Sequence, residues 1–185
     1  MKLKTKISLL LSMALLSVMI LSCEKDDSDA DFGFAKIFMP QATLANLNYN
    51  VPSGRDSATF NYKVDAQKVN VLLGVSRSGK LDLGAYSVNV VANPDTVTQM
   101  ITNGILPAAT TVVMPAAMYT LPQTVSVSDG QSQATFVLSV DRAQLKTYVG
   151  KKVVLGVVLK NPSQYTLNQA INKVVVIIDV NQLKL

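Results

Sequence analysis

The sequence predicts an all-β fold, an antiparallel sandwich of two sheets with Greek-key connections and one or two short helices. Three observations lead to this prediction. Apolar and polar residues alternate with period two along most of the chain, the pattern of strands with one buried face. Turn-forming Gly, Pro, Asn and Asp residues separate the alternating segments. About nine short strands spaced in this way are typical of an immunoglobulin-like sandwich.

The first half of the chain supplies four expected strands. The first lies near residues 35–39 and ends at Pro40, which is typical of an edge strand because proline cannot donate to a sheet ladder. Three alternating segments follow, and each keeps its apolar residues on one face. They are Phe60–Val64, Val69–Val75 and Tyr86–Val90.

Two segments carry helix signals instead of strand signals. One helix is expected to begin at Pro94, with Asn93 as its N-cap, and to stop at residues 103–104, which are Asn and Gly. Asp141 would cap a second short helix over residues 141–148. Neither helix is long enough to bury a core alone, so both are expected to connect strands.

The second half of the chain contains two kinds of strand. Residues 124–127 and 132–140 alternate, and the turn residues Ser128–Gln131 between them indicate a hairpin. By contrast, residues 153–159 and 174–180 are apolar on both faces. These last two segments are therefore expected to be central strands that are covered on both sides.

The start of the chain resembles a bacterial lipoprotein signal. Lysines precede an apolar run, Ile7–Leu21, whose 15 residues suit a secretory signal and fall short of the roughly 20 that a spanning helix needs. The only cysteine, Cys23, follows Ser22 at the end of this run in a lipobox-like sequence. We therefore expect a cleaved signal peptide, a lipidated cysteine with an acidic tether, and a β-sandwich domain. These parts are residues 1–22, 23–33 and 34–185, respectively. The alternative is an ordinary signal peptide with an incidental cysteine.

The residues after Cys23 resemble the export tag that directs lipoproteins of Bacteroidetes to the outer face of the outer membrane. Its residues here are Lys25, Asp26 and Asp27. The resemblance implies a protein that is held in the outer membrane by lipid on Cys23 and faces the cell exterior. An inner-membrane retention signal or a solvated acidic linker are the alternatives.

Composition excludes several classes of function. The chain has no His, which removes Ser-His-Asp and Cys-His nucleophile systems and histidine metal ligands. It has no Trp and no Glu beyond Glu24, so seven scattered Asp residues are the acid–base candidates, and each is more simply a cap or turn former. We therefore predict that the protein is not an enzyme and has no catalytic residue, metal site or cofactor.

Charge divides the chain into an acidic tether and a mildly basic body. Residues 32–185 carry thirteen Lys and Arg against seven Asp, a net charge of +6. Residues 24–31 carry one Lys against five acidic residues, a net charge of −4. Only Lys151 and Lys152 are adjacent in the body, so no nucleic-acid-binding patch is expected. The scattered charge indicates solvated strand ends and loops or, alternatively, attraction to an anionic polysaccharide.

Several phrases of the body together resemble a known family, the β-sandwich domain of unknown function at the N-terminus of Bacteroidetes surface lipoproteins. The phrases are Lys36–Ala42, Tyr49–Gly54, Val71–Gly79, Pro115 with Tyr119–Pro122, and Asn161-Pro162 with Tyr165–Asn168. In that family the domain precedes family-18 endo-β-N-acetylglucosaminidase, laminin-G-like or discoidin-like modules. The chain ends at Leu185, directly after its last expected strand, so it resembles the module alone. The family implies no catalytic residue.

The resemblance implies a non-catalytic surface module, an accessory or scaffold in outer-membrane glycan capture. One alternative is a stand-alone carbohydrate-binding protein, for which the candidate ligand-binding residues are Tyr49, Tyr119, Tyr165 and Asn168. Buried tyrosines whose hydroxyls bond to the backbone are the competing interpretation. A surface protein could instead pair with an edge strand at Lys36–Met39. A pilin-like adhesion subunit is the further alternative.

Overall fold

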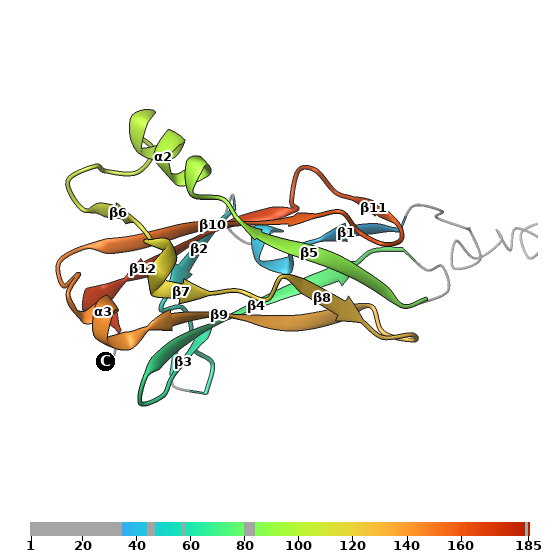
Figure 1. Cartoon of the computed structure of the whole chain (residues 1–185), viewed down its shortest axis with the longest axis horizontal. Helices are drawn as coiled ribbons and strands as arrows, with labels where there is room; N and C mark the ends of the chain where they lie inside the picture. The colour runs from blue at the N-terminus through green and yellow to red at the C-terminus, as the bar shows by residue number, and fades with distance from the viewer. Residues whose placement is uncertain (1–34, 44–46, 57, 80–83, 184) are drawn as a thin grey trace, which may run out of the picture. The chain divides into compact units, whose positions relative to one another are not determined.

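The computed structural model describes residues 35–43, 47–56, 58–79, 84–183 and 185. All of them belong to one compact unit, Gly33–Leu185. The predicted signal peptide, the predicted lipidation site Cys23 and the predicted export tag Lys25, Asp26 and Asp27 lie outside the described residues. The described residues form twelve strands in two sheets (Figure 1), so the predicted sandwich is confirmed.

The first sheet, sheet A, is built around the long antiparallel pair β4 and β9, with β1 and β3 beside different parts of β4. Outside them, β11 pairs with β1 in parallel, and β7 pairs with β9 antiparallel. The strands are β1 (Lys36–Phe38), β3 (Tyr62–Val64), β4 (Lys68–Arg77), β7 (Tyr119–Thr120), β9 (Gln133–Asp141) and β11 (Thr166–Leu167).

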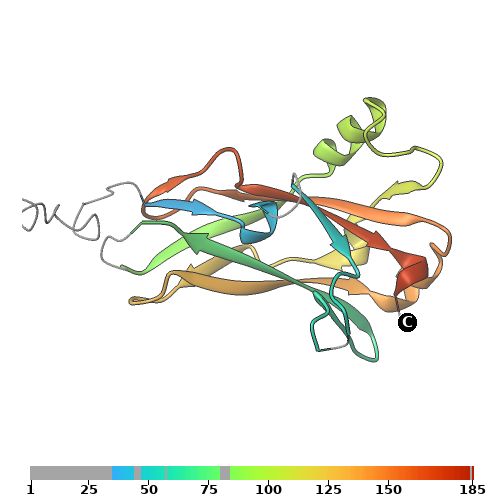
Figure 2. The same cartoon turned by 180° about the vertical axis from the view of Figure 1, so that it is seen from behind.

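The second sheet, sheet B, has β10 and β12 as its antiparallel centre. β5 and β6 pair with opposite halves of the same edge of β10, β5 antiparallel and β6 parallel. β2 pairs with β12 in parallel, and β8 pairs with β5 antiparallel. The strands are β2 (Asn48–Val51), β5 (Tyr86–Ala92), β6 (Thr111–Val113), β8 (Thr124–Val127), β10 (Lys152–Lys160) and β12 (Lys173–Asp179). Figure 2 shows the same two sheets from behind.

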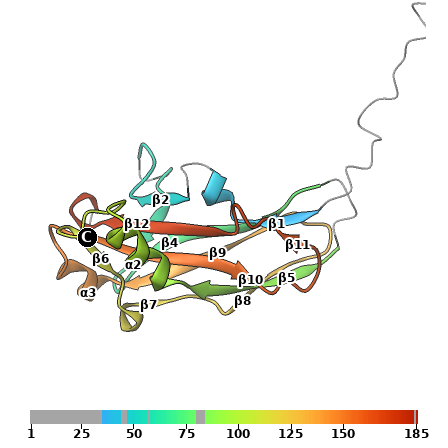
Figure 3. The same ribbon diagram turned by 90° about the horizontal axis from the view of Figure 1, so that it is seen from above.

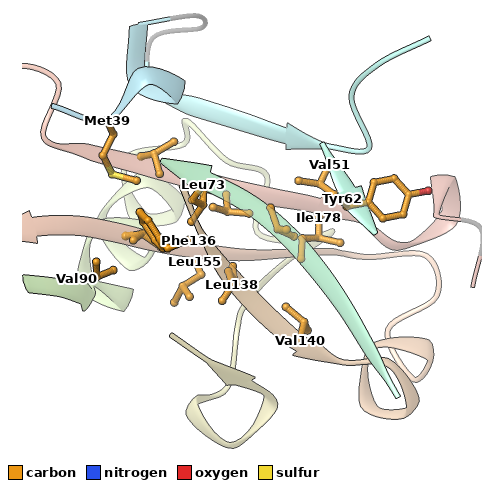
Figure 4. Packing of buried hydrophobic residues seen from close by; sticks show 14 of the residues in the cluster. Met39, Val51, Tyr62, Leu73, Val90, Phe136, Leu138, Val140, Leu155 and Ile178 are labelled. Atoms are coloured by element: carbon orange, nitrogen blue, oxygen red, sulfur yellow. The ribbon is translucent and has the colours of Figure 1, made fainter. Parts of the chain in front are cut away.

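The main core fills the space between the two sheets (Figure 4). Leu73 and Leu138 face it from sheet A, and Leu155 and Ile178 face it from sheet B; none is more than 1% exposed. The period-two alternation is what places these side chains on inner faces, because neighbouring residues of a strand point to opposite sides. Burial of such aliphatic side chains contributes about 1.5–3 kcal/mol each.

The helix α2 (Pro94–Thr102) gives sheet B a second, smaller core on its outer face. Val97 of the helix packs there against Val154 of β10 and against Val175 and Ile177 of β12. Figure 3 shows α2 beside these strands. This outer layer explains why β10 and β12 are apolar on both faces, as the sequence predicted.

Gly156 is a residue of β10. Asn93, which joins the end of β5 to the start of α2, passes directly over it. The Asn93 backbone N–H donates to the Gly156 carbonyl oxygen at 2.7 Å. A Cβ atom at position 156 would clash with the Asn93 carbonyl oxygen. The Asn93 side chain also caps α2 by accepting from the Thr96 backbone N–H. Glycine at this position therefore allows the helix to seat on the sheet.

The second predicted helix is present as α3 (Arg142–Lys146), and Asp141 is its N-cap as expected. The Asp141 carboxylate accepts from the Gln144 backbone N–H at 3.0 Å and pairs with Lys68 at 3.4 Å. The backbone hydrogen bond first, and then the Lys68 ammonium, lower the pKa of Asp141 below its ordinary 3.8.

An Asp141→Asn variant is expected to lose less stability in acid than the native protein. Because the pKa of Asp141 is lower in the folded protein than its ordinary 3.8, the ionised carboxylate stabilises the fold at pH values above 3.8. This stabilisation is lost as pH falls through the pKa of the folded state. Asparagine can still cap the helix, so the variant isolates the charge. Urea unfolding from neutral pH into acid measures the effect. An equally steep loss in both proteins would contradict it.

Two expectations about connectivity are wrong. Residues 124–127 and 132–140 do not form a hairpin, because β8 pairs with β5 in sheet B whereas β9 pairs with β4 in sheet A. The turn is present, with Gly130 at φ 74°, but it carries the chain from one sheet to the other. The segment Lys36–Met39 is not an edge, because β1 has β4 on one side and β11 on the other.

Three short 3-10 helices complete the described elements: η2 (Pro40–Thr43), η3 (Ala116–Met118) and η4 (Val180–Gln182). β1 and η4 lie at opposite ends of the sandwich (Figure 1). We call these ends the β1 end, where β1 and β11 lie, and the α3 end, where α3 and η4 lie. The ten residues of β4 run between them, a span of roughly 33 Å at strand rise.

Candidate functional site

The four residues that the sequence put forward as ligand contacts lie in different parts of the sandwich. Tyr165 and Asn168 flank β11 at the β1 end. Tyr49 lies in β2, at one edge of sheet B, and Tyr119 begins β7, at one edge of sheet A. The structure therefore brings Tyr165 and Asn168 into one segment and leaves Tyr49 and Tyr119 in separate elements.

Each of these residues also has a structural role. The Tyr49 hydroxyl donates to the Leu72 carbonyl oxygen at 3.1 Å, and burial raises the pKa of Tyr49. Burial likewise raises the pKa of Tyr119, whose ring packs against the main core. The Asn168 backbone N–H donates to the Ile37 carbonyl oxygen at 2.8 Å, which ties β11 to β1.

Tyr165 belongs to an aromatic cluster with Tyr86 and Arg77 at the β1 end. Its ring meets Tyr86 edge to face at 5.7 Å, and the Arg77 guanidinium carbon lies 4.7 Å from its centroid. Tyr165 has φ 63°, a rare conformation for a large side chain. The cluster holds Tyr165 in this conformation through edge-to-face packing and a cation–π contact.

A Tyr86→Phe variant is expected to lose less stability in alkali than the native protein. Burial raises the pKa of Tyr86 to about 12 from its ordinary 10.0, although the nearby Arg77 charge opposes the shift. Below pH 10.0 the neutral phenol makes its full contribution to the free energy of unfolding. This contribution is lost as pH rises toward about 12, the pKa in the folded protein. Unfolding free energies across that interval measure the difference. Parallel curves for the two proteins would contradict it.

A depression of about 370 Å³ on the outer face of sheet B is the candidate site. We call it the amide depression, because amide side chains dominate its polar lining. It lies between the start of α2 and the segment that joins β10 to β12. Its polar residues are Asn93, Lys160, Asn161, Gln169, Asn172 and Lys173.

The strand register explains the position of the amide depression. Val158 pairs with Lys173 across β10 and β12, and Lys160 shares their face two residues along β10. This is the face that α2 covers over Val154 and Val175. Further along this face, beyond the residues that pack against α2, Lys160 and Lys173 take the place of valines.

Asn172 is the buried polar group of the amide depression, with 7% exposure. Its Nδ2 donates to the Leu159 carbonyl oxygen at 3.4 Å and to the Gln169 Oε1 at 3.3 Å. No described residue donates a hydrogen bond to its Oδ1, and this atom is not fully enclosed. Asn172 therefore brings an acceptor without a described donor to the lining of the depression.

Positive charge without a carboxylate characterises the amide depression. No Asp or Glu lines it, and neither Lys160 nor Lys173 has an ion-pair partner among the described residues. A depression of the same volume at the α3 end contains Asp141, whose carboxylate already caps α3. The amide depression therefore offers two lysine ammonium groups without described ion-pair partners, with amide side chains beside them.

Several carboxylates of the described residues serve turns and caps. Asp56, Asp65 and Asp179 each accept from backbone N–H groups two or three residues further along the chain. Within the described ranges no three His, Cys, Asp or Glu side chains gather where they could hold a metal ion. No helix of those ranges is long and apolar enough to cross a membrane.

Sequence reasoning found the site only in part. Asn93 was predicted to cap a helix, which it does, and Asn161 belongs to one of the phrases that carry the family resemblance. The lysines and Asn172 were missed, because their grouping depends on which face of β10 and β12 the helix α2 leaves open. The available signal was the replacement of valine by lysine along the outer face of two otherwise apolar strands.

Comparison with known families identifies the class of domain. A family model described as "-like, N-terminal domain" matches residues 37–166, which is well over half of the chain. The chain therefore belongs to this family of N-terminal domains, and the resemblance drawn from its motifs is confirmed. A search of the curated proteins finds no significant match.

Solved structures from Bacteroides ovatus share the fold. One, described as a candidate carbohydrate-binding protein, has a TM-score of 0.55 at 12% identity, over 77% of this chain and 36% of its own. Another, a protein of unknown function, has a TM-score of 0.51 at 15% identity, over 84% of this chain and 46% of its own. The present chain thus spans less than half the length of these proteins. At such identities the likeness concerns the fold alone.

Proposed function

We propose that this protein is a non-catalytic, lipid-anchored module that faces the cell exterior and assists glycan capture at the outer membrane. The observation that carries the proposal is the amide depression, a preformed polar surface with unused hydrogen-bonding groups. Sugar hydroxyls both donate and accept hydrogen bonds, and amide side chains match them because they do the same. Sites for small ligands commonly place a few such groups in a concave surface.

The arrangement of the sandwich supports the scaffold part of the proposal. The first strand, which follows the tether, lies at the β1 end, and η4 lies at the α3 end (Figure 1). A partner that binds the α3 end would therefore lie about one strand length from β1. The twelve strands and the continuous core make the domain a rigid spacer.

The Bacteroides ovatus protein that is described as a candidate carbohydrate-binding protein shares this fold. This likeness supports the part of the proposal that concerns glycan capture. The interaction with a separate surface protein has weaker support, because β11 covers the strand that was expected to be open. Glycan contact through the amide depression, combined with a spacer role, is therefore the function that the described residues favour.

Glycan capture by intact cells tests the proposal. Cells that produce the full chain and matched cells that lack it are incubated with labelled host N-glycans, mucin O-glycans and plant polysaccharides. We expect the producing cells to retain more of at least one class. Equal retention of every class, with the protein shown to be present at the surface, would contradict the proposal.

A further inference from the structure

We infer that the amide depression is a subsite for an acidic saccharide unit, one that carries a carboxylate or a sulfate group. This inference rests on the proposed function and deepens it, because it names the chemical class of the glycan. It is carried by three features of the described residues: the two lysines, the absence of a carboxylate from the lining, and the amides beside them.

The lysines supply the recognition of the charged group. Lys160 and Lys173 extend from the same face of neighbouring strands: Lys173 is opposite Val158 in the paired register, and Lys160 is two residues beyond Val158 along β10. No described carboxylate pairs with either ammonium group. An acidic group bound there would accept charge-assisted hydrogen bonds, which are about twice as strong as neutral ones.

The amides supply the recognition of the sugar ring. The Asn172 Oδ1 is an acceptor for a ring hydroxyl, and its position is fixed by the two hydrogen bonds that its Nδ2 donates. Asn161 and Gln169 stand on the segment between β10 and β12 and line the same depression. A simple anion such as sulfate accepts hydrogen bonds but donates none, so it would use the lysines and leave the Asn172 Oδ1 without a donor. A saccharide with an acidic substituent uses both sets.

Part of the lining of the depression is apolar, which also suits a saccharide unit. Val158, opposite Lys173 in the register, lines it with 7% exposure. Leu167 lines the depression from β11. The C–H faces of a sugar ring can pack on such aliphatic side chains while its hydroxyls meet the amides. The depression thus combines a charged rim, amide contacts and an apolar wall.

Binding to matched oligosaccharides tests the inference. The full chain, purified in detergent, is titrated with a uronic-acid oligosaccharide, a sulfated oligosaccharide and a neutral oligosaccharide of equal length. We expect at least one acidic probe to bind more tightly than the neutral probe, and its affinity to fall with added salt. A double variant, Lys160→Gln with Lys173→Gln, is expected to weaken that binding roughly tenfold or more.

The matched control removes the same charge from the other end of the sandwich. Lys63 of β3 and Lys146 of α3 are exposed, and the double variant Lys63→Gln with Lys146→Gln should leave the affinity unchanged. If both double variants weaken binding equally, overall charge is responsible and the assignment to the depression fails. Thermal unfolding of each variant checks that the fold is retained, which surface substitutions of this kind leave nearly unaltered.

The remaining outcomes separate this inference from the proposed function. Tight binding of the neutral probe, unchanged by the acidic substituents, would overturn the inference and leave glycan capture in place. Absence of binding to all three probes and to the wider glycan classes would overturn both. Competition by inorganic sulfate at the same concentration as the acidic saccharide would show a simple anion site and would also overturn the inference.

Discussion

A Gly156→Ala variant is expected to unfold roughly 10 °C below the native protein, the shift that a loss of about 3 kcal/mol gives in a domain of this size. The added methyl group would lie well inside contact distance of the Asn93 carbonyl oxygen, and that oxygen belongs to the backbone. Real Cβ atoms do not approach so closely, so either β10 or the start of α2 must move. Movement of α2 would also open the second core around Val97.

Gly74 provides the matched control for this prediction. It lies inside the central strand β4, and a Cβ atom there would have its nearest neighbours at 3.5 Å or more, an ordinary contact distance. Because alanine restricts the unfolded chain more than glycine does, Gly74→Ala should be neutral or slightly stabilising. Thermal and urea unfolding of both variants measure the difference. Native-like unfolding of Gly156→Ala would show that α2 does not seat on β10 as described.

Replacement of Cys23 by serine is expected to release the protein from the membrane. The chain has only this cysteine, so no other thiol could carry the lipid. One acyl chain binds a membrane marginally, whereas two or more hold a protein stably, because each buried CH₂ contributes about 0.8 kcal/mol. Under the proposed lipidation of Cys23, loss of the thiol would prevent the attachment of these chains. Fractionation of cells and metabolic labelling with a radioactive fatty acid follow the two consequences.

The control for this second prediction is a conservative change beside the cysteine. Ser22→Ala keeps a small residue before Cys23 and should preserve both labelling and membrane association. Protease treatment of intact cells then reports which way the anchored protein faces. A Cys23→Ser protein that still sediments with membranes and still incorporates fatty acid would contradict the lipoprotein proposal.

Most elements of the fold could be predicted from local patterns. Period-two alternation locates a strand because it reports which side chains are buried, and Asn93 and Asp141 mark helix starts because their side chains satisfy backbone N–H groups. The pairing partner is a different matter. Val127 and Phe136 both face the main core, as they would in a hairpin, yet they lie in opposite sheets. Alternation alone does not separate these two arrangements.

The candidate site shows the same limit more strongly. Lys160 and Lys173 are thirteen residues apart in the chain, and each is an ordinary residue at a strand end. They come together through the β10–β12 register, beyond the small core in which α2 packs on Val154 and Val175. Tyrosines were the natural choice from sequence because aromatic rings bind sugars, but here their rings also pack in the sandwich.

The most direct test of the central claim is to locate a captured glycan on the protein. A photoreactive acidic oligosaccharide is bound to the full chain and cross-linked, and the modified peptides are identified by mass spectrometry. The account predicts modification of the segment from Val158 to Lys173 and of the residues around Asn93, and loss of it in the Lys160→Gln, Lys173→Gln double variant. Cross-links confined to the α3 end, or unaffected by that variant, would contradict the account.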